Sequence, residues 1–420
     1  MSQSEVFQAP QRTLAVILAG GRGKRLMDLT ANLSKPGLDF GGKYRIIDFT
    51  LSNCVNSNVR KIAVVTQYNS HRLLEHLQSG WTFLSGALNE FVHVLPAQQC
   101  LERDVWYSGT ADAVFQNIAN FQLYGPENLL VLAGDHVYKM DYRIFLEDHL
   151  NNDADLTIAC LEVPRESARA LGVAEVDAAD RLVGFCEKPE DPPCIPGKPG
   201  LAFASMGIYL FKANFLYEEL RRDAADPDST HDFGRDLIPA LIPRARVFAH
   251  RFEKSQIRNL DRPPYWRDVG TVDAYWEANM DLTYVEPALN LYDYDWPIYT
   301  HQEQLPSAKF VHSDGLRNGL AIASLVSGGC IVSGATVKKS LLFSKVRVHS
   351  HAALLEAVVL PEADIGEHAH LRKVVVARGC RIPRGLVVGE NAAEDALRFH
   401  RTPSGVTLIS QRMLDRLEGD

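Results

Sequence analysis

The chain has 420 residues, of which 46% are hydrophobic and 23% are charged. A chain of this length is expected to form about two or three domains, with a core large enough to be stable without disulfide bonds. Its 44 Lys and Arg and its 52 Asp and Glu give a net charge of −8, which argues against a protein whose main partner is nucleic acid or an anionic membrane.

Seven cysteines lie far apart in the sequence, and no two of them form a C-x-x-C pair. Their odd number and wide spacing argue against a disulfide framework or a zinc site and favour a reducing compartment. The first apolar run, Leu14–Ala19, ends at two glycines and is too short for a secretory signal or a membrane span. We therefore expect a cytoplasmic protein that has neither a membrane nor a nucleic acid as its partner.

The first half of the chain alternates between strand and helix patterns. Short apolar runs that end at Gly or polar residues predict buried strands at Leu14–Ala19, Lys61–Thr66 and Leu129–Ala133, and helical spacing predicts helices at Ser70–Leu77 and Thr110–Phe121. This alternation predicts an α/β domain with a Rossmann-like, mostly parallel sheet. Ligands bind such sheets at the carboxyl ends of the strands, so the residues just after the apolar runs are the candidates for a site.

A glycine-rich segment, Ala19–Leu26, follows the first predicted strand with the sequence AGGRGKRL. Its three glycines allow the backbone to bring N–H groups close to an anion, and its three cations flank them. Arg25 stands where the dinucleotide fingerprint has its third glycine, so this is not that fingerprint. A diphosphate or triphosphate is the expected ligand.

Two other motifs are set aside. Gly37–Lys43 has the spacing of a P-loop, but Tyr44 follows in place of the magnesium-binding Ser or Thr, and Arg45–Phe49 resembles a strand rather than a helix. The triplet Asp232–Gly234 is similar to a kinase motif, but its partner motifs do not accompany it. We therefore give neither motif a role.

Two aspartates and a lysine extend the candidate site. Asp135 follows the strand that ends at Ala133, and Asp268 lies in a loop-like segment much later in the chain. Lys35 follows the glycine-rich segment closely enough to fold back over the same phosphates. Two carboxylates together with substrate phosphates are a typical arrangement for Mg²⁺, which keeps several waters and needs few protein ligands.

The pattern changes after about residue 288. Aliphatic residues then recur every six positions, most clearly at Leu342, Val348, Leu354 and Leu360. A six-residue aliphatic period is the mark of a parallel β-helix. We therefore expect a catalytic domain at residues 1–290, a linker at 291–315 and a β-helix domain at 316–420, which the short predicted helices Glu394–Phe399 and Gln411–Leu417 would cap.

Taken together and in this order, the motifs resemble those of the bacterial glucose-1-phosphate adenylyltransferases, also called ADP-glucose pyrophosphorylases. The resemblance runs from about Leu14 to the C-terminus, and that family also carries a C-terminal left-handed β-helix. The segments that carry it are Ala19–Leu26, Lys35-Pro36, Phe40–Lys43, Arg45–Phe49, Trp106–Ala113, Leu132–His136, Glu187–Pro189, Ala204–Gly207 and Trp266–Thr271.

The resemblance implies a reaction in which glucose 1-phosphate attacks the α-phosphorus of ATP, giving ADP-glucose and pyrophosphate with Mg²⁺ as cofactor. It implies catalytic roles for Arg25, Lys35, Asp135 and Asp268, the last two as Mg²⁺ ligands. The implied ATP-binding residues are Gly20, Gly21, Arg22, Gly23 and Gln99, the last one at the adenine. The implied glucose 1-phosphate-binding residues are Tyr107, Gly172, Glu187, Lys188 and Ser205.

The resemblance also implies a homotetramer of glycogen biosynthesis that is regulated by metabolite effectors. It places Arg45 and Arg378 at the effector site and gives Gln67 and Trp106 the coupling of that site to the active site. Members that respond to fructose 1,6-bisphosphate carry a lysine at the position of Asn32 and a histidine at that of Asp39. Because this chain lacks that cation and gains a carboxylate, we expect a different or weaker response to a bisphosphate.

Three other functions are open to the same residues. A sister enzyme would use another nucleotide or sugar phosphate on the same loop chemistry. A catalytic β-helix of the acyltransferase kind would use His349, His351, His368 or His370, although nothing in the sequence indicates an acyl-CoA site. A silent regulatory subunit would lack phosphate-loop cations or the magnesium aspartate, all of which are present here.

Overall fold

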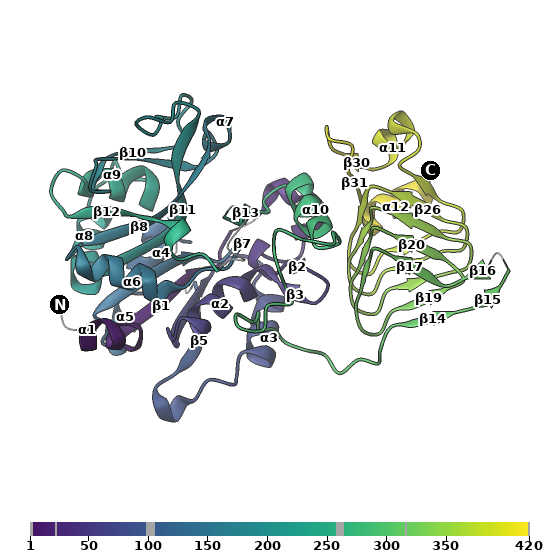
Figure 1. The fold of residues 1–420 in the computed structure, drawn as a ribbon, viewed down its shortest axis with the longest axis horizontal. Helices are drawn as coiled ribbons and strands as arrows, with labels where there is room; N and C mark the ends of the chain where they lie inside the picture. The colour runs from purple at the N-terminus through teal and green to yellow at the C-terminus, as the bar shows by residue number, and fades with distance from the viewer. Residues whose placement is uncertain (1–2, 22, 98–105, 258–263, 316, 419–420) are drawn as a thin grey trace.

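The computed structural model describes residues 3–21, 23–97, 106–257, 264–315 and 317–418. Figure 1 shows an α/β domain followed by a parallel β-helix, with the polypeptide entering the β-helix through a long extended segment. This architecture confirms the predicted fold class. None of the helices described has the length and hydrophobicity needed to span a membrane.

The α/β domain is built on a nine-stranded sheet in which β10, β9, β11, β6, β1, β4 and β5 are neighbours in that order, and β8 joins β11 to β12. The strands are β1 (Thr13–Leu18), β4 (Lys61–Thr66), β5 (Phe91–Pro96), β6 (Asn128–Ala133), β8 (Leu156–Pro164), β9 (Gly172–Val176), β10 (Leu182–Glu187), β11 (Leu201–Lys212) and β12 (Val247–Arg251). The helices are α1 (Gln3–Gln8), α2 (Ile46–Asn56), α3 (His71–Gly80), α4 (Thr110–Phe115), α5 (Ile118–Leu123), α6 (Tyr142–Asn151), α7 (Arg165–Ala168), α8 (Ala213–Ala224), α9 (Ile238–Leu241) and α10 (Val272–Asp281).

The centre of the sheet is parallel. Strands β6, β1, β4 and β5 all pair in parallel, whereas β11 pairs antiparallel with β6, β8 and β9. The three strands expected from the sequence, β1, β4 and β6, are adjacent in this parallel block. Because their carboxyl ends lie at one edge of the sheet, the segments that follow them converge there.

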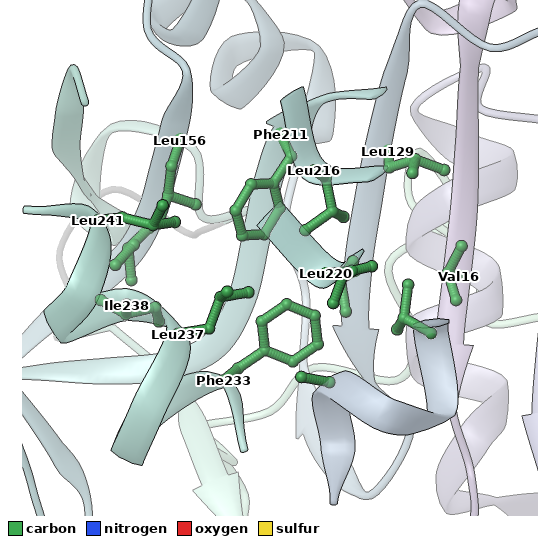
Figure 2. Close-up of a cluster of buried hydrophobic side chains, with 14 of the residues drawn as sticks. Val16, Leu129, Leu156, Phe211, Leu216, Leu220, Phe233, Leu237, Ile238 and Leu241 are labelled. Carbon is green, nitrogen blue, oxygen red and sulfur yellow. The ribbon is translucent and has the colours of Figure 1, made fainter. Parts of the chain in front are cut away.

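Alternate residues of β1 belong to two different cores, one on each face of the sheet. Leu14 and Val16 pack with α4, α8 and α9, and Figure 2 shows part of this core with Val16 among its side chains. Ala15 and Ile17 pack with α2, α3 and α6. A strand that is apolar on both faces is therefore buried on both sides, which explains the continuous apolar runs in the sequence.

Two of the expected elements differ from the structure. The helix expected over residues 110–121 is divided into α4 and α5. The strand expected at Arg45–Phe49 was wrong, because α2 begins at Ile46. The Asp48 side chain accepts a hydrogen bond from the backbone N–H of Arg45 at 2.7 Å and so caps this helix, which outweighs the strand preference of Ile46 and Ile47. Strand β2 (Asp39–Phe40) and strand β3 (Tyr44–Arg45) form a short hairpin just before it.

The β-helix has three parallel faces. The first is β14 (Lys309–Val311), β19 (Ile331–Ser333), β22 (Arg347–Val348), β25 (Asp364–Ile365) and β28 (Arg381–Ile382). The second is β17 (Leu320–Ile322), β20 (Thr336–Lys338), β23 (Ala353–Leu355), β26 (His370–Arg372) and β29 (Val387–Val388). The third is β18 (Leu325–Val326), β21 (Leu341–Leu342), β24 (Val358–Val359), β27 (Val374–Val376) and β31 (Thr407–Ile409), to which β30 (His400–Arg401) pairs antiparallel.

Aliphatic side chains stack along each face. On the first face the register places Val332, Val348, Ile365 and Ile382 in one column, and all four are buried. The six-residue period therefore places one buried aliphatic residue on each face of every coil, as expected for a left-handed β-helix. Strand β14 begins at Lys309, within the range 291–315 that the sequence assigned to a linker.

Two short helices close the C-terminal end, as the sequence predicted. Helix α11 (Ala392–Arg398) lies beyond the last coils in Figure 1, and α12 (Gln411–Glu418) follows β31. Leu414 of α12 is buried in the core of the β-helix.

Helix α10 joins the two domains (Figure 1). The indole N–H of Trp276 donates to the Glu356 carbonyl oxygen at 2.9 Å, and the Asp273 carboxylate accepts hydrogen bonds from the hydroxyls of Thr402 and Ser404, each at 2.6 Å. One buried hydrophobic cluster contains residues of both domains. The β-helix is therefore packed on the α/β domain and is not tethered by the connecting segment alone.

Candidate active site

A cavity of about 550 Å³ lies at the carboxyl ends of β1, β4 and β6. Most of the residues predicted for the site line it. They are Gly20, Gly21, Arg25, Gln67, Tyr107, Asp135, Gly172, Glu187, Lys188, Ser205 and Asp268. The parallel block of the sheet brings Gly20, Gly21, Gln67 and Asp135 to this edge, and the antiparallel strands β9, β10 and β11 carry Gly172, Glu187 and Ser205.

The other predicted residues lie elsewhere. Lys35 is buried directly beside the cavity, and its side chain is only 5% exposed. Trp106 is 61% exposed and does not line the cavity. Arg45 and Arg378 line a second cleft. Two predicted ATP-binding residues, Arg22 and Gln99, lie outside the described residues.

The glycine-rich segment makes a tight turn at its third glycine. Gly23 has φ +60°, which favours glycine, and a Cβ there would lie 3.1 Å from side-chain carbons of both Thr30 and Lys35. The Thr30 hydroxyl donates to the Gly23 carbonyl oxygen at 3.0 Å, which holds the turn. By contrast, a Cβ at Gly21 would meet nothing within 4 Å, so the backbone there has open space in front of it.

Three charged side chains form the centre of the site. The Lys35 Nζ lies 2.9 Å from an Asp135 oxygen and 2.5 Å from an Asp268 oxygen. Burial by itself lowers the pKa of Lys35, but the attraction of the two carboxylates outweighs it, and the pKa is raised. Burial likewise opposes ionisation of Asp135, but its neighbours His136 and Lys35 bring the pKa of Asp135 down to about 2. At neutral pH Lys35 is therefore an ammonium and Asp135 a carboxylate, in direct contact with each other.

Strand pairing explains why the two aspartates meet. Strand β13 (Trp266–Asp268) is antiparallel to β7 (His136–Tyr138), and Asp268 lies opposite His136 in this pair. The sequence contains each aspartate motif but gives no signal for this pairing between distant segments. A carboxylate oxygen of Asp135, a ring nitrogen of His136 and a carboxylate oxygen of Asp268 all lie within 4.8 Å of one another. Two hard oxygen ligands and one imidazole fit a divalent cation.

The opposite wall is built around the Glu187 carboxylate. A Cβ on Gly172 would lie 2.9 Å from a Glu187 oxygen, and a Cβ on Gly234 would lie 2.6 Å from the same oxygen. Both positions therefore have to lack a side chain for Glu187 to lie between them. Lys188 donates to the other Glu187 oxygen at 2.7 Å. The result is a carboxylate and an ammonium side by side at the cavity wall.

Several lining residues were not among those predicted. They are His136, Tyr209, Asp232, Phe233 and Trp266. Asp232 accepts hydrogen bonds from the Gly234 backbone N–H at 2.9 Å and from the Thr110 hydroxyl at 3.0 Å, so it caps and fixes the start of the π-helix Phe233–Leu237, which carries Gly234. The triplet that contains Asp232 was visible in the sequence, but only its place in the fold gives it a role.

Comparisons with known proteins match both domains of the chain. Residues 14–284 match the family model described as Nucleotidyl transferase, and residues 306–409 match the model described as GlmU-like, C-terminal hexapeptide. The chain is 56% identical to the glucose-1-phosphate adenylyltransferase of Dechloromonas aromatica over 404 residues, which cover 96% of this chain and 92% of that protein. It is 57% identical to the protein of the same name from Nitrosomonas europaea (96% and 94% covered) and 55% identical to that from Rhodospirillum rubrum (97% and 97% covered). The chain therefore belongs to the nucleotidyl transferase family and, within it, to the glucose-1-phosphate adenylyltransferases.

Proposed function

We propose that this chain transfers the adenylyl group of ATP to glucose 1-phosphate and releases ADP-glucose and pyrophosphate, as a step of glycogen biosynthesis. The observation that carries the proposal is a single cavity with two walls of different chemistry. One wall has an open glycine-rich backbone with Arg25 and two carboxylates, behind which Lys35 is buried, and this wall suits a triphosphate. The other has the Glu187–Lys188 pair, which suits a sugar phosphate.

The reaction needs positioning and charge compensation more than covalent help. A phosphate oxygen of glucose 1-phosphate is already anionic, so it can attack without a general base, and the protein has to hold it in line with the α-phosphorus. The backbone N–H groups around Gly21 and the Arg25 guanidinium would hold the triphosphate. Glu187 would accept hydrogen bonds from sugar hydroxyls, and Lys188 would pair with the sugar phosphate.

Asp135 and Asp268 would hold a divalent metal, which we propose to be Mg²⁺. Enzymes of this family generally use a divalent metal, and when bound it neutralises phosphate oxygens. Lys35 keeps the two carboxylates together before substrate arrives, since its Nζ contacts both. The same ammonium would then stabilise charge near the transferred phosphoryl group.

The test is pyrophosphate release with glucose 1-phosphate, Mg²⁺ and, in turn, ATP, UTP, GTP, CTP or dTTP. We expect release with ATP above the others, and a loss of about 100-fold or more in kcat/KM for Asp135→Asn. Asp191→Asn is the control, because this aspartate is exposed and lies outside the cavity. Better use of another nucleotide would move the chain to a sister activity, and no release with any nucleotide would favour a regulatory subunit.

We also propose that the enzyme is a cytoplasmic homotetramer regulated by phosphorylated metabolites. The candidate effector site is the second cleft, of about 300 Å³, which lies between the catalytic domain and the β-helix. Arg45 of the hairpin and Arg378 of the β-helix line it together with Lys43 and Lys345. Sedimentation velocity would give the oligomeric state, and activity in the presence of candidate phosphates would test the regulation.

A further inference from the structure

An ion-pair triad occupies the cleft between the two domains. The Asp39 carboxylate lies 3.0 Å from an Arg45 Nη atom and 2.8 Å from an Arg378 Nη atom. The second Asp39 oxygen lies 3.1 Å from the same Arg378 atom. The Asp39 side chain is only 8% exposed, and those of the two arginines are 18% and 21% exposed. Two guanidinium groups therefore share one carboxylate, away from most of the solvent.

The fold accounts for this arrangement. Asp39 and Arg45 lie directly opposite each other in the β2–β3 hairpin, so their pairing is local. Arg378 comes from the turn after β27 and reaches the hairpin from the β-helix. The Asp39 backbone is held separately, because its carbonyl oxygen accepts a hydrogen bond from the Tyr275 hydroxyl at 2.5 Å. The Asp39 side chain can therefore exchange partners while its backbone stays in place.

The rest of the cleft has the chemistry of an anion site. Its cations are Lys43, Arg45, Lys345 and Arg378. Its other carboxylates are more exposed: Glu362, which pairs with Arg378 at 3.1 Å, is 49% exposed, and Glu303, which pairs with Lys345 at 2.6 Å, is 47% exposed. A buried N–H, the Nε of Arg378, has no hydrogen-bond partner among the described residues. Arg378 thus retains donor capacity that Asp39 and Glu362 do not use.

We propose that Asp39 is a built-in competitor for the effector: its carboxylate takes the place between Arg45 and Arg378 that a phosphate group would take. A phosphate offers more acceptor oxygens and more charge than a carboxylate, and it matches the guanidinium fork. Asp39 is tethered beside the arginines, so the cleft accepts a phosphate only in the fraction of molecules in which this carboxylate has moved away. The apparent affinity is lowered by that fraction. This inference rests on the effector site proposed above. It identifies Asp39 as the residue that sets the effector concentration at which that site is filled.

If a phosphate replaced Asp39 as the partner of Arg45, the change would be transmitted to the active site through a short segment of the chain. The same Arg45 Nη atom that contacts Asp39 also donates to the Gly37 carbonyl oxygen at 2.9 Å. Gly37 ends the 3-10 helix Lys35–Gly37, whose first residue contacts both active-site aspartates. A phosphate that draws Arg45 away from Asp39 therefore acts on a side chain tied two residues from Lys35.

The experiment is a calorimetric titration of the full-length protein with inorganic phosphate at constant ionic strength. We expect Asp39→Asn to bind phosphate about tenfold or more tightly than the wild type, because the arginines lose their tethered anion. Arg378→Gln added to Asp39→Asn should abolish that gain, which separates binding in this cleft from binding in the active-site cavity. Asp39→Ser repeats the test with a shorter side chain should the Asn variant not fold.

Glu362→Gln is the matched control. It removes one negative charge from the same cleft and from the same arginine, but it leaves the Asp39 bridge intact. Equal gains in Glu362→Gln and Asp39→Asn would mean that only net charge matters and would overturn the proposal, as would no gain in either Asp39 variant. The titration does not depend on turnover: an inactive chain with the expected gain would refute the proposed activity alone, and an active chain without it would refute this inference alone.

Discussion

At the scale of single residues, the Lys35 ammonium offsets the repulsion between the Asp135 and Asp268 side chains. Two carboxylates that converge on one point repel each other, and burial makes the repulsion stronger. The Lys35 ammonium contacts both and is itself almost fully buried, so the three charges stabilise one another before any ligand is present. Of these three side chains, Asp135 and Asp268 line the cavity. Their second oxygens do not contact Lys35 and could hold a metal, although that of Asp268 lies 3.5 Å from an Arg25 Nη atom.

His136 adds an imidazole to these two carboxylates. Burial lowers the pKa of His136, which favours the neutral form that a metal ligand requires. Carboxylates suit both Mg²⁺ and Mn²⁺. Mn²⁺, as a transition metal, accepts an imidazole ligand more readily than the harder Mg²⁺ does. We therefore expect His136→Gln to weaken Mn²⁺ binding several-fold and Mg²⁺ binding much less.

The measurement for His136 is the free Mn²⁺ signal in electron paramagnetic resonance, with Mg²⁺ added as a competitor. His149→Gln is the control, since this histidine is also buried but does not line the cavity. A variant that binds both cations as the wild type does would remove His136 from the metal site.

At the scale of elements, the proposed sugar side of the cavity depends on the first turn of the π-helix Phe233–Leu237, which lies very close to the end of β10. A Cβ on Gly234 would lie 2.6 Å from the Glu187 carboxylate, and Asp232 caps the helix there. Gly234→Ala should therefore displace Glu187 and raise the KM for glucose 1-phosphate about tenfold, with a smaller effect on the KM for ATP. Steady-state kinetics with each substrate varied in turn would measure the two values. Gly200→Ala is the control because a Cβ there meets nothing within 4 Å, and equal rises in both KM values would contradict the assignment.

The elements also indicate what a sequence can and cannot predict. Strands β1, β4 and β6 were predictable because burial on both faces leaves continuous apolar runs, and Asp135 was predictable because it follows such a run. The helix at Ile46 was missed because two β-branched residues outweigh a cap in a short window. The approach of Asp268 to Asp135 depends on the β7–β13 pairing, and no local pattern encodes a pairing between segments this far apart.

At the scale of the whole molecule, the two domains share one hydrophobic cluster. It contains Phe40 and Tyr275 of the catalytic domain together with Phe343, Leu360 and Leu408 of the β-helix. Such a shared core opposes independent motion of the domains, unlike a pair of domains joined only by a linker. It also brings the β-helix residue Arg378 to the Asp39–Arg45 hairpin, so the cleft exists only while the domains stay packed.

The two domains are therefore expected to unfold together, in one cooperative transition. Phe343 is fully buried in the shared cluster, and Phe343→Ala should lower the free energy of unfolding by about 3–5 kcal/mol, because it leaves a cavity between the domains. We expect one calorimetric transition for the wild type and two for this variant, since the β-helix would lose its attachment before its own aliphatic columns melt. Phe310→Ala is the matched control: Phe310 is 43% exposed at the first coil, and its loss should leave one transition near the wild-type temperature. Two transitions in the wild type would mean that the shared cluster does not couple the domains, and the route from the cleft to Lys35 would then have to run within the hairpin alone.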